Sequence, residues 1–202
     1  MEQLQEFAKK LTQRGFQTQV CKDAKEAREA ALSLVEEGAS AGFGGSMTIS
    51  QLGIYETLQE KGHAVYWHWK AEPQQRSAVM ENARTADIYF SSANAILEDG
   101  RIVNIDGGGN RVSSLFYGPK RVVIVAGINK ICGDLQDGIA RIKREACPPN
   151  ARRLGLKTPC AVTGTCADCR SPQRICNVTT VMEQPAMVKD VHVILVNEKL
   201  GY

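Results

Sequence analysis

The fold is decided by the stretch ASAGFGGSMTISQLGIYETLQEKGHAVYW, residues 39–67. Its first five residues are small or apolar, as in a short buried strand, and residues 47–61 carry the apolar spacing of a helix. Residues 64–67 then return to strand-forming residues. A strand, a helix and a second strand in this order indicate two parallel strands joined by a helical crossover.

The same alternation continues on both sides of this stretch. We expect further helices at residues 2–14, 24–37, 73–84 and 134–146, and further strands at residues 16–20, 86–91, 121–126, 178–182 and 191–196. Residues 94–105 differ, because two short strands flank Glu98-Asp99-Gly100 as in a β-hairpin. Cys147-Pro148-Pro149 should break the last helix, and the last two strands should close the fold. The pattern predicts an α/β fold with a mainly parallel sheet and helices on both faces.

The bulk composition restricts the class of protein. The chain has 202 residues, of which 43% are hydrophobic and 23% charged, and its net charge is +3. This size suits one domain over residues 1–202, and the small net charge gives no support for a nucleic-acid partner. No segment approaches the ~18 apolar residues of a membrane span, and residues 1–10 lack the apolar stretch of a signal peptide. We therefore expect a cytoplasmic protein with reduced thiols and no membrane partner.

A glycine-rich loop, Gly42-Phe43-Gly44-Gly45-Ser46-Met47-Thr48, joins the first strand of the opening stretch to its helix. Glycines let the backbone approach a ligand closely, and a helix N-terminus offers free N–H groups to an anion. We predict that Gly44, Gly45, Ser46 and Thr48 bind an anionic or nucleotide-like ligand. The alternative is a tight strand-to-helix turn with Ser46 as the N-cap. The loop has neither the Rossmann glycine pattern nor the lysine of a P-loop.

A second glycine-rich loop, Asn104-Ile105-Asp106-Gly107-Gly108-Gly109-Asn110-Arg111, follows the hairpin. Three successive glycines cost backbone entropy that a simple turn does not require. We predict that ligand-facing residues here are Asn104, Asp106, Gly107, Gly108, Gly109, Asn110 and Arg111, with Arg111 as a surface-loop arginine that grips a carboxylate or phosphate. The alternative is a mobile surface loop. Because both loops follow strands, we expect them to face one cleft that binds an anionic small molecule.

Four of the seven cysteines, Cys160, Cys166, Cys169 and Cys176, cluster near the end of the chain. In a reducing compartment such a cluster predicts a metal site rather than disulfides. Cys166 and Cys169 form a chelating pair, and the two outer cysteines complete four-sulfur ligation. The spacing matches no zinc ribbon. We predict that residues 155–177 are an irregular loop ordered by a [4Fe–4S] cluster, with zinc and unligated thiols as the alternatives.

The remaining candidates are weaker. Cys21 and Cys132 are expected to be packing residues, and Cys147 is a marginal alternate ligand because it lies near the loop. His68 ends a strand, where ligand sites gather in such sheets, although a lone histidine is more often structural. No Ser/His/Asp pattern and no pair of carboxylates indicates a reaction, so the catalytic residues are unknown.

Five segments together resemble the lactate-utilisation (LUD) domain family, and more narrowly its short bacterial members with a C-terminal cysteine motif: GFGGSMTISQLGIYETL, YWHWK, SSANAILEDGRIVNIDGGGNR, YGPKRVVIVAGINKI and LKTPCAVTGTCADCRSPQRICNV. The resemblance implies a fold related to ribose-5-phosphate isomerase, glucosamine-6-phosphate deaminase and the CoA transferases. In those relatives a glycine-rich strand-to-helix loop binds phosphate or cofactor, and Ser46 and Thr48 stand in that kind of position. The resemblance also implies a role in oxidising L-lactate or a related small organic acid, alongside iron–sulfur redox partner proteins.

Three functions fit these observations. The first is an iron–sulfur protein of lactate or related organic-acid metabolism. The second is a stand-alone enzyme on a phosphorylated or nucleotide-like small molecule, with a structural metal. The third is a metal-stabilised module that senses a metabolite. A homo-oligomer is compatible with each.

Overall fold

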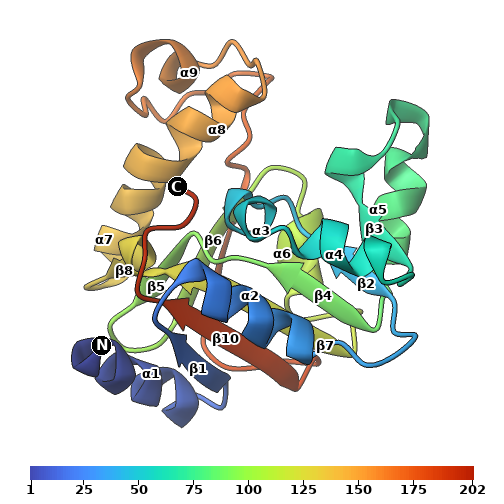
Figure 1. Ribbon diagram of the computed structural model, residues 1–202. Helices are drawn as coiled ribbons and strands as arrows, with labels where there is room; N and C mark the ends of the chain where they lie inside the picture. Colours follow the sequence, from blue (N-terminus) through green and yellow to red (C-terminus); the bar gives the residue numbers. More distant parts are fainter.

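The centre of the protein is a six-stranded sheet in which every pair of neighbouring strands is parallel (Figure 1). The computed structural model describes residues 1–202. The strands run in the order β1-β10-β7-β4-β2-β3. They are β1 (Gln17–Cys21), β2 (Ala41–Phe43), β3 (Val65–Trp67), β4 (Ile88–Ser91), β7 (Arg121–Gly127) and β10 (Asp190–Val196). The prediction of an α/β fold with a mainly parallel sheet is confirmed.

The opening stretch forms the crossover that its sequence predicts. Strand β2 is followed by α3 (Met47–Leu52) and α4 (Ile54–Glu60), and β3 then pairs in parallel with β2. The helix expected over residues 47–61 is divided in two at Gly53, whose φ of 62° is left-handed. A left-handed residue ends a helix, and glycine adopts that conformation without strain. Gly53 therefore turns one expected helix into two short ones.

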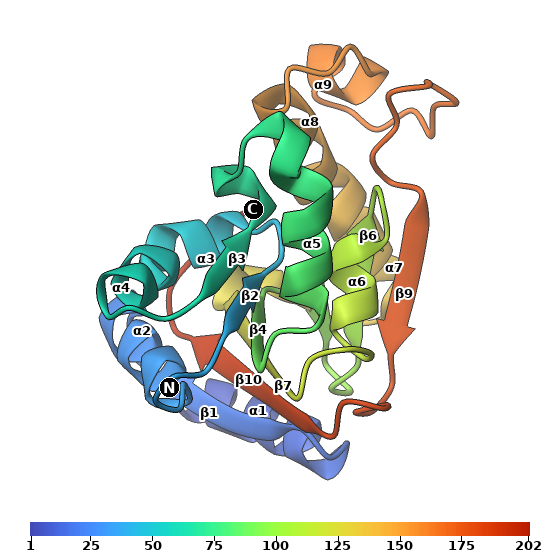
Figure 2. The same cartoon turned by 90° about the vertical axis from the view of Figure 1, so that its right-hand side faces the viewer.

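Alternate side chains of the central strands build two apolar layers. On β7, Val123 and Val125 pack with residues of α2 (Ala24–Ser33), α3 and α4. Val122 and Ile124 point the other way and pack with α1 (Glu2–Gln13), α5 (Arg76–Arg84) and the end of α6 (Asn110–Ser114). Figure 2 shows α2 to α4 on one side of β2 and β4, with α5 and α6 on the other. Helices thus cover both faces, because a strand that is apolar on both faces must be buried on both.

A second, four-stranded sheet lies beside the first, in the order β8-β5-β6-β9. It contains the predicted hairpin, β5 (Ala95–Leu97) paired antiparallel with β6 (Ile102–Asp106), together with β8 (Ile131–Cys132) and β9 (Val178–Met182). The last two expected strands are both present, as β9 and β10, and they lie in different sheets. Strand β10 is apolar and buried, so it lies inside the parallel sheet, whereas the first residues of β9 are exposed and suit a sheet edge.

The expectation that Cys147-Pro148-Pro149 breaks the last long helix is wrong. Helix α7 (Leu135–Arg141) continues through one π-helical turn, η4 (Ile142–Ala146), into α8 (Cys147–Arg153). The prolines fall in the first turn of α8, where a missing N–H costs little. Ile142 and Ala146 pack on the outer face of the second sheet. The continuous helix carries the chain away from the sheets to the cysteine segment (Figure 1).

The remaining elements are short. Residues 155–177 are not wholly irregular, because they include α9 (Pro159–Thr163). Three single turns of 3-10 helix complete the structure: η1 (His68–Lys70), η2 (Pro73–Gln75) and η3 (Ile128–Lys130). None of the helices combines the length and apolar character that a bilayer crossing demands.

Candidate functional site

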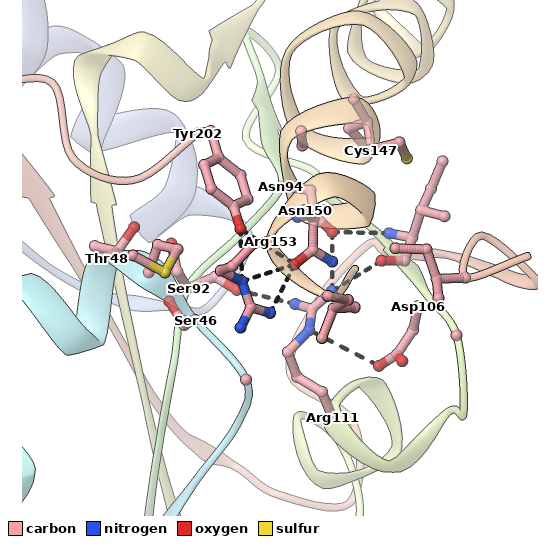
Figure 3. A pocket seen from close by; sticks show the side chains of 18 of the residues that line it. Ser46, Thr48, Ser92, Asn94, Asp106, Arg111, Cys147, Asn150, Arg153 and Tyr202 are labelled. Atoms are coloured by element: carbon pink, nitrogen blue, oxygen red, sulfur yellow. Dashed lines mark hydrogen bonds and ion pairs between the residues drawn. The ribbon is translucent and has the colours of Figure 1, made fainter. Parts of the chain in front are cut away.

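A cavity of about 230 Å³ opens at the carboxyl ends of the parallel strands (Figure 3). Its lining includes residues that follow β2, β3, β4 and β7, residues of the second glycine-rich loop, and residues of η4 and α8. In an open α/β sheet this edge is where ligand crevices form, because the loops after the strands diverge there. The fold therefore brings segments that are far apart in sequence around one space.

Both glycine-rich loops line this cavity. Three predicted residues come from the first loop and five from the second: Gly45, Ser46 and Thr48, then Asp106, Gly107, Gly108, Asn110 and Arg111. Gly44, Asn104 and Gly109 do not line it. The expected placement of the two loops at one cleft is therefore present in the structure, and the binding of a ligand there stays a prediction.

The first loop is a helix cap as well as a cavity wall. The Ser46 hydroxyl accepts a hydrogen bond from the Ile49 amide at 3.2 Å, which makes Ser46 the N-cap of α3. Gly44 lies beneath the cavity, where a Cβ would come within 2.8 Å of Arg111 Cγ. A side chain at position 44 would thus displace Arg111. The close approach of the two loops therefore requires a glycine at this position.

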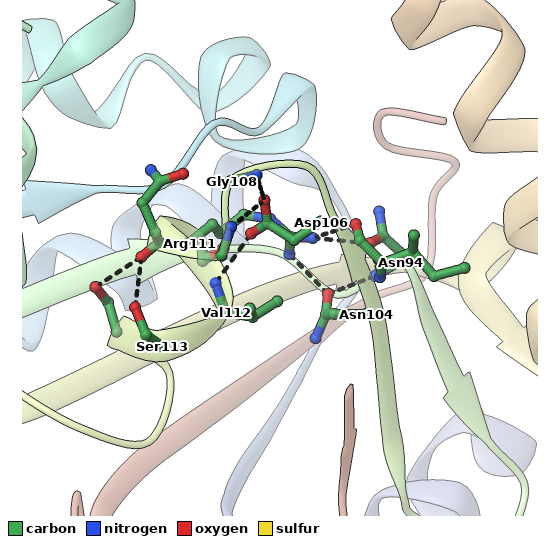
Figure 4. Close-up of polar contacts among 12 residues, drawn as sticks. Asn94, Asn104, Asp106, Gly108, Arg111, Val112 and Ser113 are labelled. Carbon is green, nitrogen blue, oxygen red and sulfur yellow. Dashed lines mark hydrogen bonds and ion pairs between the residues drawn. The ribbon is translucent and has the colours of Figure 1, made fainter. Parts of the chain in front are cut away.

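The second loop is held by its own aspartate. Asp106 Oδ1 accepts hydrogen bonds from the amides of Gly108 at 3.2 Å and Gly109 at 3.3 Å, and Oδ2 accepts one from the Val112 amide at 3.1 Å (Figure 4). The carboxylate therefore occupies the N–H groups at the start of α6. Asn104 is buried beside Asp106, and its Oδ1 accepts a hydrogen bond from the backbone N–H of Asn94.

Arg111 braces the site and is not on the surface. Its side chain is buried, and Nη1 donates to Asn104 Oδ1 at 2.7 Å and to Ser92 O at 3.2 Å. Nη2 donates to Asn94 Oδ1 at 2.8 Å and to Ile105 O at 3.0 Å. Burial lowers the pKa of the guanidinium. The expectation that Arg111 is a surface-loop arginine is therefore wrong, because its side chain is buried and four protein oxygens accept hydrogen bonds from it. It still lines the cavity, and its binding of a ligand stays a prediction.

Lys130 is the residue that the sequence analysis missed. It is only 3% exposed, lines the cavity, and donates from Nζ to Thr48 Oγ1 and Ser92 Oγ, both at 3.1 Å. It forms no ion pair with a carboxylate. Burial, reinforced by the positive charges of Arg141 and Arg111, lowers the pKa of Lys130 to about 7. The available signal was a lysine in the short turn that follows the most hydrophobic strand, since that turn lies at the carboxyl edge of the sheet.

The mouth of the cavity is aromatic and cationic. The Arg153 guanidinium stacks over the Trp69 ring at 4.1 Å, and its Nε donates to the Tyr202 hydroxyl at 3.0 Å. Trp69 in turn stacks on Trp67, with 5.2 Å between ring centroids. His68 also lines the cavity, and burial, together with the nearby Arg76 charge, lowers its pKa. Arg153 therefore links α8 to the far side of the cavity mouth.

The cysteine segment adjoins this cavity. All seven cysteines are free; Cys21 is buried in the core as expected, and Cys160, Cys166, Cys169 and Cys176 are partly exposed. Cys147 lines the cavity. Burial raises the pKa of Cys147 to about 12, with smaller contributions from the nearby thiols of Cys176, Cys166 and Cys160. No three histidine, cysteine or acidic side chains already have metal-ligating geometry. By donor chemistry, free thiols from one segment suit a thiolate-bound centre.

Backbone contacts tie the cysteine segment together and to the second loop. Arg174 donates to the carbonyls of Cys169 at 2.6 Å and Cys176 at 3.0 Å. The Asn177 amide donates to Asp106 O at 2.9 Å, and Ile175 lines the cavity. Asp168, between Cys166 and Cys169, is the one non-glycine residue with positive φ, at 44°. The segment that carries the thiols is thus attached to the loop that forms the cavity wall.

The fold and the site together define an α/β protein with a cavity at the carboxyl edge of a parallel sheet. The sequence profile of the LUD domain matches residues 4–196, so the chain belongs to the LUD domain family. Its structure is similar to the crystal structure of a DUF162 family protein from Deinococcus radiodurans, with a TM-score of 0.56, 13% sequence identity and 97% of each chain covered. At this identity the likeness supports the fold alone. Among curated proteins, none matches the chain significantly.

Proposed function

We propose that this protein is an iron–sulfur protein of the lactate-utilisation type whose cavity binds L-lactate or a related small organic acid. The observation that carries the proposal is Lys130, a cation buried in the cavity wall between two hydroxyls and without a carboxylate partner. An unpaired buried ammonium is unfavourable, and a bound carboxylate relieves that cost. Membership of the LUD domain family supports the link to organic acids.

The charges and size of the cavity support a small acid over a nucleotide-like ligand. Its lining contains Lys130, Arg111 and Arg153 but a single carboxylate, Asp106, which is already bonded to backbone amides. Its volume of about 230 Å³ lies below the ~300–1,000 Å³ typical of pockets for drug-sized ligands. A three- or four-carbon acid suits both properties.

In this proposal Cys160, Cys166, Cys169 and Cys176 hold the cluster, and zinc is the alternative occupant. A cluster supplies one-electron transfer. Arg174 and Lys143, which converge on Asp168 at 3.0 and 3.4 Å, offset the negative charge of a thiolate-bound centre. Seven free thiols support a reducing compartment such as the cytoplasm. The electrons would pass to or from iron–sulfur partner proteins.

The test is anaerobic purification followed by two measurements. Iron, acid-labile sulfide and zinc are quantified, and calorimetry then compares L-lactate and pyruvate with the neutral analogue lactamide and with ribose 5-phosphate. We expect iron with sulfide, and binding of the carboxylates but not of lactamide. Zinc without sulfide would overturn the cluster, and equal binding of lactate and lactamide would overturn the acid site. Tighter binding of the sugar phosphate would favour an enzyme of phosphorylated substrates instead.

A further inference from the structure

The lysine in the cavity wall is placed to react, not only to attract an anion. We propose that Lys130 is a catalytic nucleophile whose amine forms an imine with the carbonyl carbon of a small 2-oxo acid bound in the cavity. This inference rests on the proposed function, because it takes the same cavity and the same class of acid. It adds a covalent step that the sequence did not indicate.

The hydrogen bonds of Lys130 leave one position on its nitrogen free. Nζ donates to Thr48 Oγ1 and to Ser92 Oγ, each at 3.1 Å. Each hydroxyl also has a backbone carbonyl within reach of its own hydrogen, Leu200 O for Thr48 and Ala93 O for Ser92, each at 3.3 Å. The hydroxyls therefore accept from the amine. A neutral amine has two N–H groups and one lone pair, so two accepting hydroxyls use both N–H groups and leave the lone pair without a partner.

Burial and the surrounding charges bring the protonated and neutral forms of Lys130 into balance near pH 7, so that the ammonium attracts the acid and the neutral amine is present to attack it. Arg111 is fixed by its four protein acceptors, and Arg141 is fixed by donating to Asn129 O at 2.7 Å and Asn94 O at 2.8 Å. Both cations are thus held near Lys130 and cannot turn away. Together with burial they lower the pKa of Lys130 to about 7. A lysine desolvated beside other cations is the usual form of an amine nucleophile in enzymes.

The step balances without an oxidant. The Nζ lone pair attacks the carbonyl carbon of the 2-oxo acid, a C–N bond forms, and the carbonyl π pair moves to oxygen, which takes up a proton. The carbinolamine then loses one water to give the imine, so the amine and the 2-oxo acid yield the imine and water. Ser92 and Thr48 are the nearest hydroxyls for the proton transfers. A 2-hydroxy acid such as lactate has no carbonyl at this carbon, so only its oxidised form reacts.

The experiment traps the imine in the purified full-length protein. The protein is incubated with pyruvate and cyanoborohydride at neutral pH, digested, and each lysine is examined by mass spectrometry for the reduced adduct. Lys120 is the matched control, because it precedes β7 while Lys130 follows it, and its side chain is 83% exposed and paired with Asp87. An ordinary lysine has ~10³-fold less neutral amine at pH 7, so we expect labelling of Lys130 to exceed that of Lys120 at least ~10-fold.

Two variants and the binding measurement complete the test. Lys130→Arg should lose the adduct, Lys120→Arg should keep it, and excess lactate should slow labelling of Lys130 by occupying the cavity. Equal labelling of Lys130 and Lys120 in the unmodified protein would overturn the inference, whatever the variants do. If pyruvate binds in calorimetry and Lys130 stays unlabelled, the imine is wrong while the acid-binding function stands. If no carboxylate binds and no adduct forms, both are wrong.

Discussion

The cavity wall and the cysteine segment differ in what holds them together. Around the cavity, Asn104, Asp106 and Arg111 of the second glycine-rich loop are buried, and Arg111 contacts both of the others. In residues 155–177 only Thr158 is buried, and Val162 is 78% exposed. The first region is ordered by apolar burial and a polar network, whereas the second has almost no core of its own. The difference indicates that the cavity is held by the protein's own contacts. For the cysteine segment it agrees with our proposal of a metal centre, which would supply the order that a core does not.

Metal binding should change the cysteine segment most. Structural metal sites contribute on the order of 10 kcal/mol of apparent binding free energy, and here that energy would order residues 155–177. Limited proteolysis should therefore cut this segment in metal-free protein and spare it after cluster or metal incorporation. Cys169→Ser should lose the centre, whereas Cys132→Ser, a half-buried thiol of β8, should keep it. Full metal content in Cys169→Ser would show that Cys169 is not a metal ligand, and a metal could then not explain the contrast between the cysteine segment and the cavity wall.

Replacing the brace of the cavity should have the next largest effect. Arg111→Met leaves four buried protein acceptors without their donor, so we expect a loss of about 3–5 kcal/mol in the free energy of unfolding. Urea denaturation measures it. The control is Arg101→Met, which removes hairpin ion pairs to Asp99 and Glu183 and should cost less than ~1 kcal/mol. Similar losses in the two variants would mean that the Arg111 network is not a structural core.

The pH dependence of stability tests the charge of Lys130. The pKa of Lys130 is about 7 in the folded protein, while an unfolded chain keeps a lysine protonated to ~10.4. Between these two pKa values the unfolded state binds more protons than the folded state, so the free energy of unfolding should rise with pH. As the pH falls toward 7, Lys130 becomes protonated in the native protein and this stability is lost. From about pH 6.5 to about pH 8.5 the protein should gain about 2 kcal/mol relative to Lys130→Met. Parallel pH profiles for the two proteins would show that Lys130 has an ordinary pKa.

The sequence predicted the scaffold well because its signals are local. The alternation of strands and helices and the Glu98-Asp99-Gly100 turn depend on residues close in the chain, and they led to the sheet and the hairpin. Both glycine-rich loops were also expected at one cleft, because position after a parallel strand fixes which edge a loop occupies. The division at Gly53 was missed, since a left-handed glycine inside a helical pattern gives no periodic signal.

The roles of single side chains were predicted less well because they depend on distant partners. Arg111 looked like a loop arginine, and its burial follows from Ser92, Asn94 and Asn104, which come from another strand end and from the hairpin. Lys130 meets Thr48 across 82 positions of sequence. The π-helical turn before Pro148 likewise depends on packing of η4 against the second sheet. Such contacts have no counterpart in local pattern.

The smallest expected effect lies where the two regions meet. Arg153 on α8 stacks over Trp69 at 4.1 Å and donates to Tyr202. Helix α8 leads to the cysteine segment, so Arg153 connects that helix with the far side of the cavity mouth. Cation–π contacts at exposed sites contribute ~0.5–1 kcal/mol, so Arg153→Met should lower stability by about that amount. Because a cation also leaves the mouth, lactate should bind several-fold more weakly, and tryptophan fluorescence should change.

Its neighbour Arg152 provides the control, since it is on the same helix but donates to Ala161 O at 2.9 Å within the cysteine segment. Arg152→Met removes the same charge from α8 and leaves the Trp69 stack in place. We therefore expect it to alter proteolysis of residues 155–177 without changing lactate affinity or fluorescence. The opposite pattern, with affinity following Arg152 rather than Arg153, would mean that the cysteine segment and not the mouth controls entry. In that case the cavity and the cysteine segment would have to be treated as one unit.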